Sequence, residues 1–197
     1  MLAERTAAEP GTQLLAVAPL TTVATALRAD PGLADRLGHL WVMAGDWADP
    51  AAVEHNVLSD VTAARAVFAA GCPTTVIGID VTRQVHLVEE HLAAFEGTGE
   101  LGRILAVQAR AWMRRWGEPF EIPHDPLTAL AIVRPDLFDF SDAGTVDVSD
   151  GTDGRAEGSA THEPGDGSVR VALGVDAAAC VDELVTRILR GLGAPRP

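Results

Sequence analysis

Three short polar clusters, at residues 19–21, 54–56 and 124–126, combine residue types that can bind a sugar and a cation. Asp125 offers a carboxylate and the segment around Thr21 a backbone carbonyl, and calcium prefers such oxygen ligands. Glu54 and Asn56, two residues apart, can hold sugar hydroxyls, and the imidazole of His124 can give a proton to a leaving group. Two cation ligands are fewer than the roughly six to eight that calcium takes. The clusters predict a site for a polyhydroxylated ligand that lacks part of its metal shell.

Each cluster also has a purely structural interpretation. Thr21 follows a predicted strand, where a threonine commonly forms a turn or caps a helix. Glu54 and Asn56 can belong to a loop surface. Asp125 stands directly before Pro126, the order expected of a helix N-cap and the first helical residue. No single cluster is specific, so the prediction of a site depends on all three together.

The apolar segments that position these clusters predict an α/β fold. Strands are expected at residues 13–18, 39–43 and 74–79, with weaker strands at residues 145–148 and 169–175. Helices are expected at residues 2–8, 22–29, 61–70, 89–95, 101–116, 126–133 and 176–192. Near-continuous apolar strands between helices indicate a mostly parallel, open sheet with flanking helices on both faces. In such sheets ligands bind at the carboxyl ends of the strands.

The composition narrows the class of protein. The 197 residues fit one domain, and a net charge of −13, from 28 acidic and 15 basic residues, argues against nucleic acid or an anionic membrane as partner. Cys72 and Cys180 fall at expected interior positions without disulfide or metal-ligand spacing, so a cytoplasmic location is expected. No apolar run reaches the roughly 18 residues of a membrane span, and no signal peptide is expected. Residues 150–167, rich in glycine and acids, are expected to form a loop or hairpin tip.

Several segments, taken in order, resemble the inosine–uridine-preferring nucleoside hydrolase family. The sequence contains counterparts of six family motifs, in the same order. LLAVAPLTTVATALRADP resembles the segment with the Gly-Pro-Leu-Thr-Asn turn, HLWVMAG the strand that ends in Met-Gly-Gly, and EHNVLSDVTAARAVFAAG the Glu-Phe-Asn segment. TTVIGIDVTRQV resembles the strand with the Asp-Val-Thr turn, HDPLTALAIVRPDLF the His-Asp-Pro helix, and VRVALGVDAAACVDELVTRIL the closing strand and helix. The resemblance covers essentially the whole chain. It implies a Rossmann-like fold and hydrolysis of the N-glycosidic bond of purine or pyrimidine nucleosides, which gives a free base and ribose.

The resemblance also implies a calcium ion and a leaving-group acid. The ion would hold the ribose 2′- and 3′-hydroxyls and the attacking water, as in other metal-assisted and glycosidic hydrolyses. Asp125 matches the family's C-terminal calcium carboxylate, and Thr21 matches the threonine that gives a backbone carbonyl to calcium. His124 matches the histidine that protonates the leaving base.

Other residues match the family's sugar and base contacts. Glu54 and Asn56 match the pair that binds the 5′ side of the ribose, and Met43 matches a methionine of the ribose pocket. Trp112 and Trp116 lie on the helix before the His-Asp-Pro motif, where the family places aromatic residues near the base, although packing in the core would explain them equally well.

The chain departs from the family pattern most at the metal site. The family begins with a strand that carries an Asp-x-Asp-x-x-x-Asp-Asp motif. This motif supplies most of the carboxylates that bind calcium and the base that activates water. No such run occurs in this sequence. Residues 2–5 resemble the inside of a family helix. We therefore expect a single truncated domain over residues 1–197, equivalent to the C-terminal two-thirds of the fold with the N-terminal strands missing. Smaller departures are Thr22 for Asn, Ala44 for Gly and His55 for Phe.

Three functional interpretations follow. The chain is a ribonucleoside hydrolase that binds a nucleoside or ribose-like small molecule, with its upstream segment lost to a mis-called start or supplied by a complementing N-terminal chain. Alternatively it is a non-catalytic remnant with a weak sugar pocket, or a structural partner subunit that pairs through an open sheet edge. A homo-oligomer is compatible with each of them. We expect the isolated chain to hydrolyse inosine or uridine poorly or not at all.

Overall fold

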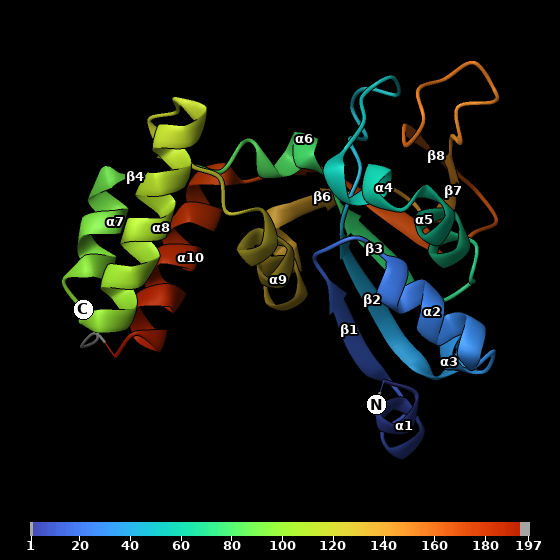
Figure 1. The fold of residues 1–197 in the computed structure, drawn as a ribbon. Helices are drawn as coiled ribbons and strands as arrows, with labels where there is room; N and C mark the ends of the chain where they lie inside the picture. The colour runs from blue at the N-terminus through green and yellow to red at the C-terminus, as the bar shows by residue number, and fades with distance from the viewer. Residues whose placement is uncertain (1, 194–197) are drawn as a thin grey trace.

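A computed structural model describes residues 2–193 and contains a seven-stranded, mostly parallel mixed sheet with helices on both faces (Figure 1). The strands are β1 Thr12–Ala16, β2 Leu37–Met43, β3 Thr74–Ile77, β4 Leu87–Val88, β5 Phe120–Glu121, β6 Phe138–Phe140, β7 Gly144–Val148, β8 Ala160–Pro164 and β9 Val169–Val175. The helices are α1 Leu2–Ala8, α2 Thr21–Ala29, α3 Leu33–Arg36, α4 His55–Ser59, α5 Val61–Phe68, α6 Ile79–Thr82, α7 Glu89–Glu96, α8 Glu100–Trp116, α9 His124–Val133, the 3-10 helix η1 Pro135–Leu137 and α10 Ala177–Gly191. The predicted α/β class is confirmed.

The sheet has the order β1-β2-β3-β9-β7-β8, with β6 paired to β9. Strands β1, β2, β3 and β9 are mutually parallel, in a register that pairs Val42 with Val76 and Val76 with Val171. Because these strands run in one direction, their carboxyl ends meet at one edge of the sheet. The segments after β1, β2 and β3 therefore come together there.

Strand β8 corrects one expectation. Residues 150–167 were expected to be a loop or hairpin tip, yet β8 lies within them and pairs with β7 along its whole length. The strand is polar because it is the last of the sheet order, and backbone pairing at such an edge does not require apolar side chains. Only the part of the expected loop between β7 and β8 connects the two strands as a tip.

Two apolar clusters cover the two faces of the sheet. Successive residues of β2 point to opposite faces, so Val42 packs with α2 and α5 while Trp41 packs with α9 and α10. Burial of side chains such as Val42, Leu127 and Leu130 contributes about 1.5–3 kcal/mol each. This packing holds the carboxyl edge of the sheet in a fixed geometry. Cys72 and Cys180 are buried and unpaired, as the sequence predicted.

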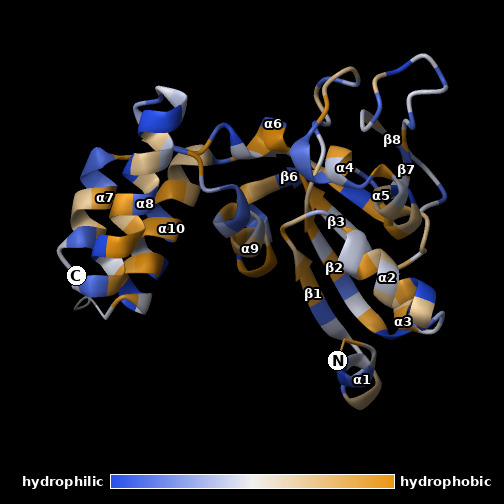
Figure 2. Ribbon diagram, in the orientation of Figure 1, coloured by the Kyte–Doolittle hydropathy of each residue, from blue (hydrophilic) through white to orange (hydrophobic). Residues whose placement is uncertain are grey.

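Helices α7, α8 and α10 form a third cluster beside the sheet, seen as a separate bundle in Figure 1. Leu92 and Phe95 pack there with Ala106, and Figure 2 shows hydrophobic residues along the helices of this bundle. Gly102 permits close contact between α7 and α8, because a Cβ atom at that position would lie 1.9 Å from the Phe95 carbonyl oxygen. No helix within residues 2–193 combines the length and apolar character needed to cross a membrane.

Candidate active site at the carboxyl edge of the sheet

Glu54 joins the end of β2 to the start of α4. Its side chain is only 4 % exposed, which contradicts a loop-surface position. One carboxylate oxygen accepts the Asn56 backbone N–H at 2.8 Å, and the other accepts the N–H groups of Val57 at 3.2 Å and Gly45 at 3.1 Å. Glu54 is therefore the N-cap of α4 and also holds the turn after β2.

Asn56 completes this connection. Its side-chain amide donates a hydrogen bond to the Met43 carbonyl oxygen at 3.0 Å and lies 3.5 Å from the Met43 sulfur. Because the NH₂ group is directed at the strand, the amide oxygen is the atom available to a ligand. The structure thus brings Met43, Glu54 and Asn56 together at the carboxyl end of β2.

His124 is held by a residue that the sequence analysis did not single out. Thr82, at the end of α6, places its hydroxyl oxygen 2.7 Å from Nδ1 of His124 and is fully buried. Burial, and secondly the positive charge of Arg83, lowers the pKa of His124 below its usual value. The imidazole is therefore mostly neutral near pH 7, and its Nε2 remains to face a ligand.

Asp125 does not cap a helix, so that interpretation is wrong. Helix α9 already begins at His124, its N-cap is Pro123, and no side-chain cap bond forms. The Asp125 side chain is exposed and has no hydrogen bond within the described residues. Desolvation, and secondly the charge of Glu54, raises the pKa of Asp125. The two carboxylates are thus close enough to repel each other, an arrangement that a cation would stabilise.

Thr21 is the first residue of α2, and its side chain is already bonded. The hydroxyl donates to a carboxylate oxygen of Asp60 at 2.6 Å, and this bond, followed by that from the Ala63 N–H, lowers the pKa of Asp60. Asp60 caps α5, so Thr21 ties α2 to the α4–α5 junction. Within residues 2–193, no group of three or more His, Cys, Asp or Glu side chains is placed to hold a metal ion.

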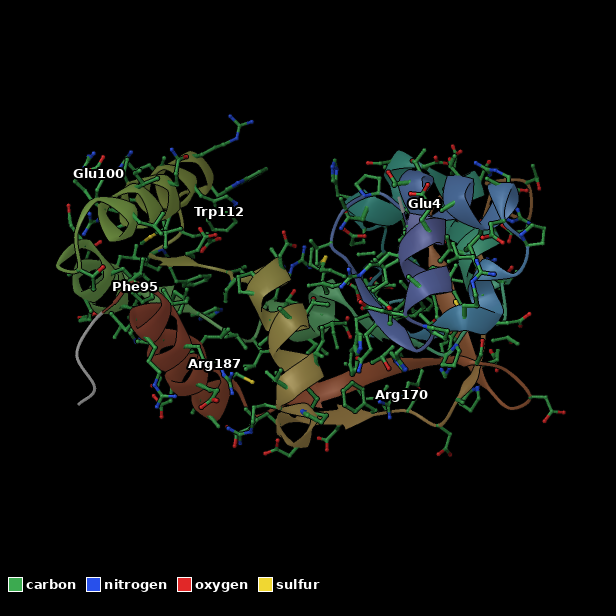
Figure 3. All side chains as sticks on the ribbon, turned by 90° about the horizontal axis from the view of Figure 1, so that it is seen from below. Glu4, Phe95, Glu100, Trp112, Arg170 and Arg187 are labelled. Carbon is green, nitrogen blue, oxygen red and sulfur yellow. The ribbon has the colours of Figure 1, made fainter. Side chains whose placement is uncertain are left out.

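A cavity of about 620 Å³ lies next to His124 and Asp125, between α8 and the segment from β5 to α9. Trp112 lines it, whereas Trp116 is 60 % exposed and lies outside. In Figure 3, Trp112 is at the end of α8 nearer to α9. Of the two tryptophans expected near a base, only Trp112 reaches the cavity.

Several residues of this region were missed by sequence reasoning. Glu121 lines the cavity, and its signal was a single acid inside the apolar segment PFEIP. Asp46 follows β2 and Asp80 is the second residue of α6, and each could have been recognised as an acid shortly after a predicted strand. Burial, and in part the charge of Asp46, raises the pKa of Asp80, and one of its oxygens is buried without a hydrogen-bond partner in the described chain.

Comparison with known proteins places this geometry in a family context. A family model described as inosine-uridine preferring nucleoside hydrolase matches residues 1–182. Uridine nucleosidase 1 of Arabidopsis thaliana is 31 % identical over 138 residues, which cover 64 % of this chain and 40 % of that protein. A plant nucleoside hydrolase structure superposes with a TM-score of 0.81 at 27 % identity, over 95 % of this chain and 65 % of the other. A purine-preferring ribonucleoside hydrolase from Gardnerella vaginalis gives a TM-score of 0.83 at 25 % identity, over 96 % of this chain and 64 % of the other.

The chain is shorter than these proteins. It spans 40–45 % of the length of the first curated relatives that it matches and about two-thirds of the solved structures. Residues 1–182, which the family model matches, include the polar clusters around Thr21, Glu54 and Asp125.

Proposed function

The chain belongs to the inosine-uridine preferring nucleoside hydrolase family, and from this membership we propose that its carboxyl-edge site takes part in hydrolysing the N-glycosidic bond of ribonucleosides. The observation that supports the proposal is that His124 and Asp125, at the start of α9, line a cavity large enough for a base, while Glu54, before α4, is near enough for its charge to act on Asp125. A sugar at the carboxylates and a base in the cavity would place the glycosidic bond between them.

The ribose would be bound by the residues at the end of β2. The amide oxygen of Asn56 can accept a hydrogen bond from a ribose hydroxyl, and the Met43 side chain lies next to it. Glu54 already accepts three backbone N–H groups, so its main effect is to fix the geometry of α4, with capacity for one more donor such as the 5′-hydroxyl.

The base would occupy the cavity against Trp112, with His124 beside the departing nitrogen. The Thr82 hydroxyl has the Ile79 carbonyl oxygen as an acceptor at 3.3 Å, so its oxygen can accept the Nδ1–H of a protonated His124 and leave the Nε2–H directed at the ligand. The protonated form of His124 donates a hydrogen bond from Nε2 to the leaving base and transfers that proton as the glycosidic bond breaks, which leaves a neutral imidazole. Expelling a neutral base instead of an anion lowers the barrier.

Calcium fits the described residues only in part. Asp125 offers an exposed carboxylate and Thr21 a backbone carbonyl, whereas calcium takes roughly six to eight oxygen ligands. Since no group of three or more His, Cys, Asp or Glu side chains within residues 2–193 is placed to hold a metal ion, these residues do not make a complete calcium site. We propose that the remaining ligands come from a complementing polypeptide segment.

The same observation favours a second candidate function for the chain by itself. A nucleoside can bind to Asn56, Trp112 and the cavity without being cleaved, because binding needs fewer groups than water activation. The chain would then be a nucleoside-binding protein or a partner subunit. Buried, unpaired cysteines are typical of a reducing compartment, and we propose a cytoplasmic location for either function.

Binding and cleavage should be measured separately on the purified chain. We expect inosine or uridine to bind, and Asn56→Ala and His124→Ala to weaken binding, whereas Glu118→Ala, an exposed change outside the cavity, should not. Absence of nucleoside binding, or binding insensitive to Asn56 and His124, would refute the proposed site.

Release of ribose in the presence of calcium distinguishes the two functions. Bound but uncleaved nucleoside supports the second candidate for this chain alone. Robust calcium-dependent release that Asp125→Asn abolishes would support hydrolysis and overturn the view that its calcium ligands are incomplete.

A further inference from the structure

The cavity beside His124 holds more space than a nucleobase fills. Its volume of about 620 Å³ lies within the roughly 300–1,000 Å³ of pockets that take whole drug-sized ligands. A purine base consists of two fused rings, and in the proposed function the ribose lies outside the cavity, at the carboxylates. Part of the cavity therefore remains available to atoms that an unsubstituted base does not have.

The available part of the cavity extends along α8. The lining residues of that helix run from Leu105 to Arg115, and Leu105 precedes Trp112 by seven residues. At about 1.5 Å per residue, this separation is about 10 Å along the helix axis. Figure 3 shows Glu100 at the end of α8 away from α9 and Trp112 at the end nearer to it, so Leu105 lies farther from α9 than Trp112 does. A base placed against Trp112 and next to His124 leaves the Leu105 end free.

The walls of the cavity are apolar and accessible to a ligand. The side chain of Leu105 is 42 % exposed, and Ala109, Ile122 and Ile188, from three different segments, are half-buried. The fold therefore leaves part of each of these apolar side chains uncovered. A ligand group without polar atoms would remove that surface from water, which favours binding in proportion to the area covered.

The chemistry of a purine nucleoside decides which of its atoms reach this end. The exocyclic group on C6 lies across the two rings from N9, the atom that is bonded to ribose. With N9 beside His124, a substituent on the C6 group projects away from the glycosidic bond and into the rest of the cavity. An alkyl or aromatic substituent matches the apolar walls, because its burial requires no hydrogen-bond partner.

We propose that the cavity selects purine ribonucleosides whose 6-amino group carries an apolar substituent, and that Leu105 is a specificity-determining residue for that substituent. This inference rests on the proposed function, since it assumes that the cavity holds the base of a nucleoside. It deepens that function by naming a class of substrate, which family membership alone does not specify.

Binding of adenosine, N6-methyladenosine and N6-butyladenosine to the whole chain tests this inference. A fully buried methylene group raises affinity about fourfold, and a partly buried one about twofold. We therefore expect N6-butyladenosine to bind at least about eightfold more tightly than N6-methyladenosine, since it carries three more methylene groups. Leu105→Gln should lower this ratio at least about threefold and leave the affinity for adenosine almost unchanged, because a polar amide replaces part of the apolar wall.

The matched control is Leu101→Gln. Leu101 lies one turn earlier on α8 and is 60 % exposed, but it does not line the cavity. The affinity ratio of the two alkylated nucleosides should therefore be retained in this variant. A ratio that falls equally in Leu101→Gln and Leu105→Gln would mean that alkyl chains adhere to the exposed surface of α8, which would overturn the inference.

The remaining outcomes separate the inference from the proposed function. Equal affinities for the two alkylated nucleosides in the unmodified chain, or a ratio that Leu105→Gln leaves unchanged, would overturn the inference, while binding of adenosine leaves the proposed function standing. Failure of all three nucleosides to bind would overturn both. Retained adenosine binding shows that Leu105→Gln is folded. Loss of adenosine binding with an unchanged circular dichroism spectrum would place Leu105 against the base and refute its role toward the substituent.

Discussion

Replacing Glu121 by glutamine should stabilise the protein, and the gain should grow as the pH rises. Burial without a hydrogen-bond donor raises the pKa of Glu121 from 4.5 to about 7. Between these two values the unfolded chain has released the proton while the folded protein still holds it. The unfolded state then binds fewer protons, so the free energy of unfolding falls as the pH rises through this window. The penalty is absent below the lower pKa and complete above the higher one.

The size of the effect follows from the two pKa values. Each pKa unit between 4.5 and about 7 corresponds to about 1.36 kcal/mol, which sets an upper limit near 3 kcal/mol. Glu121 is only partly buried, and solvent screening reduces this to about 1–2 kcal/mol. Arg115, His124 and Asp125 line the same cavity and are kept in the variant, so the comparison with the unmodified chain isolates the effect of removing the Glu121 carboxyl group.

Urea unfolding at about pH 4 and about pH 8 measures this difference. We expect Glu121→Gln to match the unmodified protein at the lower pH and to exceed it by about 1–2 kcal/mol at the higher pH. Glu118→Gln, an exposed change, should show no such trend. A Glu121→Gln variant that is less stable at about pH 8, or a difference independent of pH, would refute the reasoning, because it would mean that the carboxylate has a compensating partner.

Three further predictions concern the carboxyl edge. Glu54→Ala should lower the free energy of unfolding in urea by about 2–3 kcal/mol, because a buried carboxylate that accepts three backbone N–H groups is lost, and a change below about 0.5 kcal/mol would contradict its capping role. Asp125→Asn should leave the melting temperature unchanged or higher, since the carboxylate has no hydrogen bond in the described residues. The same variant should bind calcium more weakly in calorimetry, and unchanged calcium binding would remove Asp125 from any metal site. The His124 imidazole should titrate below 6.5 in NMR, and Thr82→Val should shift its ring signals, whereas an unaltered ring spectrum would show that the 2.7 Å bond does not form in solution.

Local sequence patterns were sufficient for the larger elements. The apolar runs at residues 39–43 and 74–79 predicted β2 and β3, because strands buried on both faces require continuous apolar residues. The spacing over residues 101–116 predicted α8, which starts one residue earlier. The short elements α4, α6, β4 and β5 were not predicted, since a segment of two to five residues carries too little periodicity to be recognised.

The candidate site was predictable in its members but not in its contacts. Met43, Glu54 and Asn56 were chosen from the sequence, and the structure does bring them together. The sequence pattern around Asp125 suggested a helix cap, and the fold decided otherwise by starting α9 at the preceding residue, which left the carboxylate exposed. Glu121 was missed because an acid in an apolar segment gives no indication of whether it will point into a cavity or into solvent.

The sequence by itself determined the α/β class, the order of the main strands and helices, and the residue types at the carboxyl edge, because each depends on neighbours within a few positions. Only the tertiary structure decided which polar groups are already used and which remain available. Thr21 bonds to Asp60 across 39 positions and Thr82 to His124 across 42, and both bonds arise when separate strands end at the same edge of the sheet. Hydrogen bonding and burial depend on such distant contacts, so the charge state of His124 and the unsatisfied carboxyl group of Glu121 emerge only when the chain is folded.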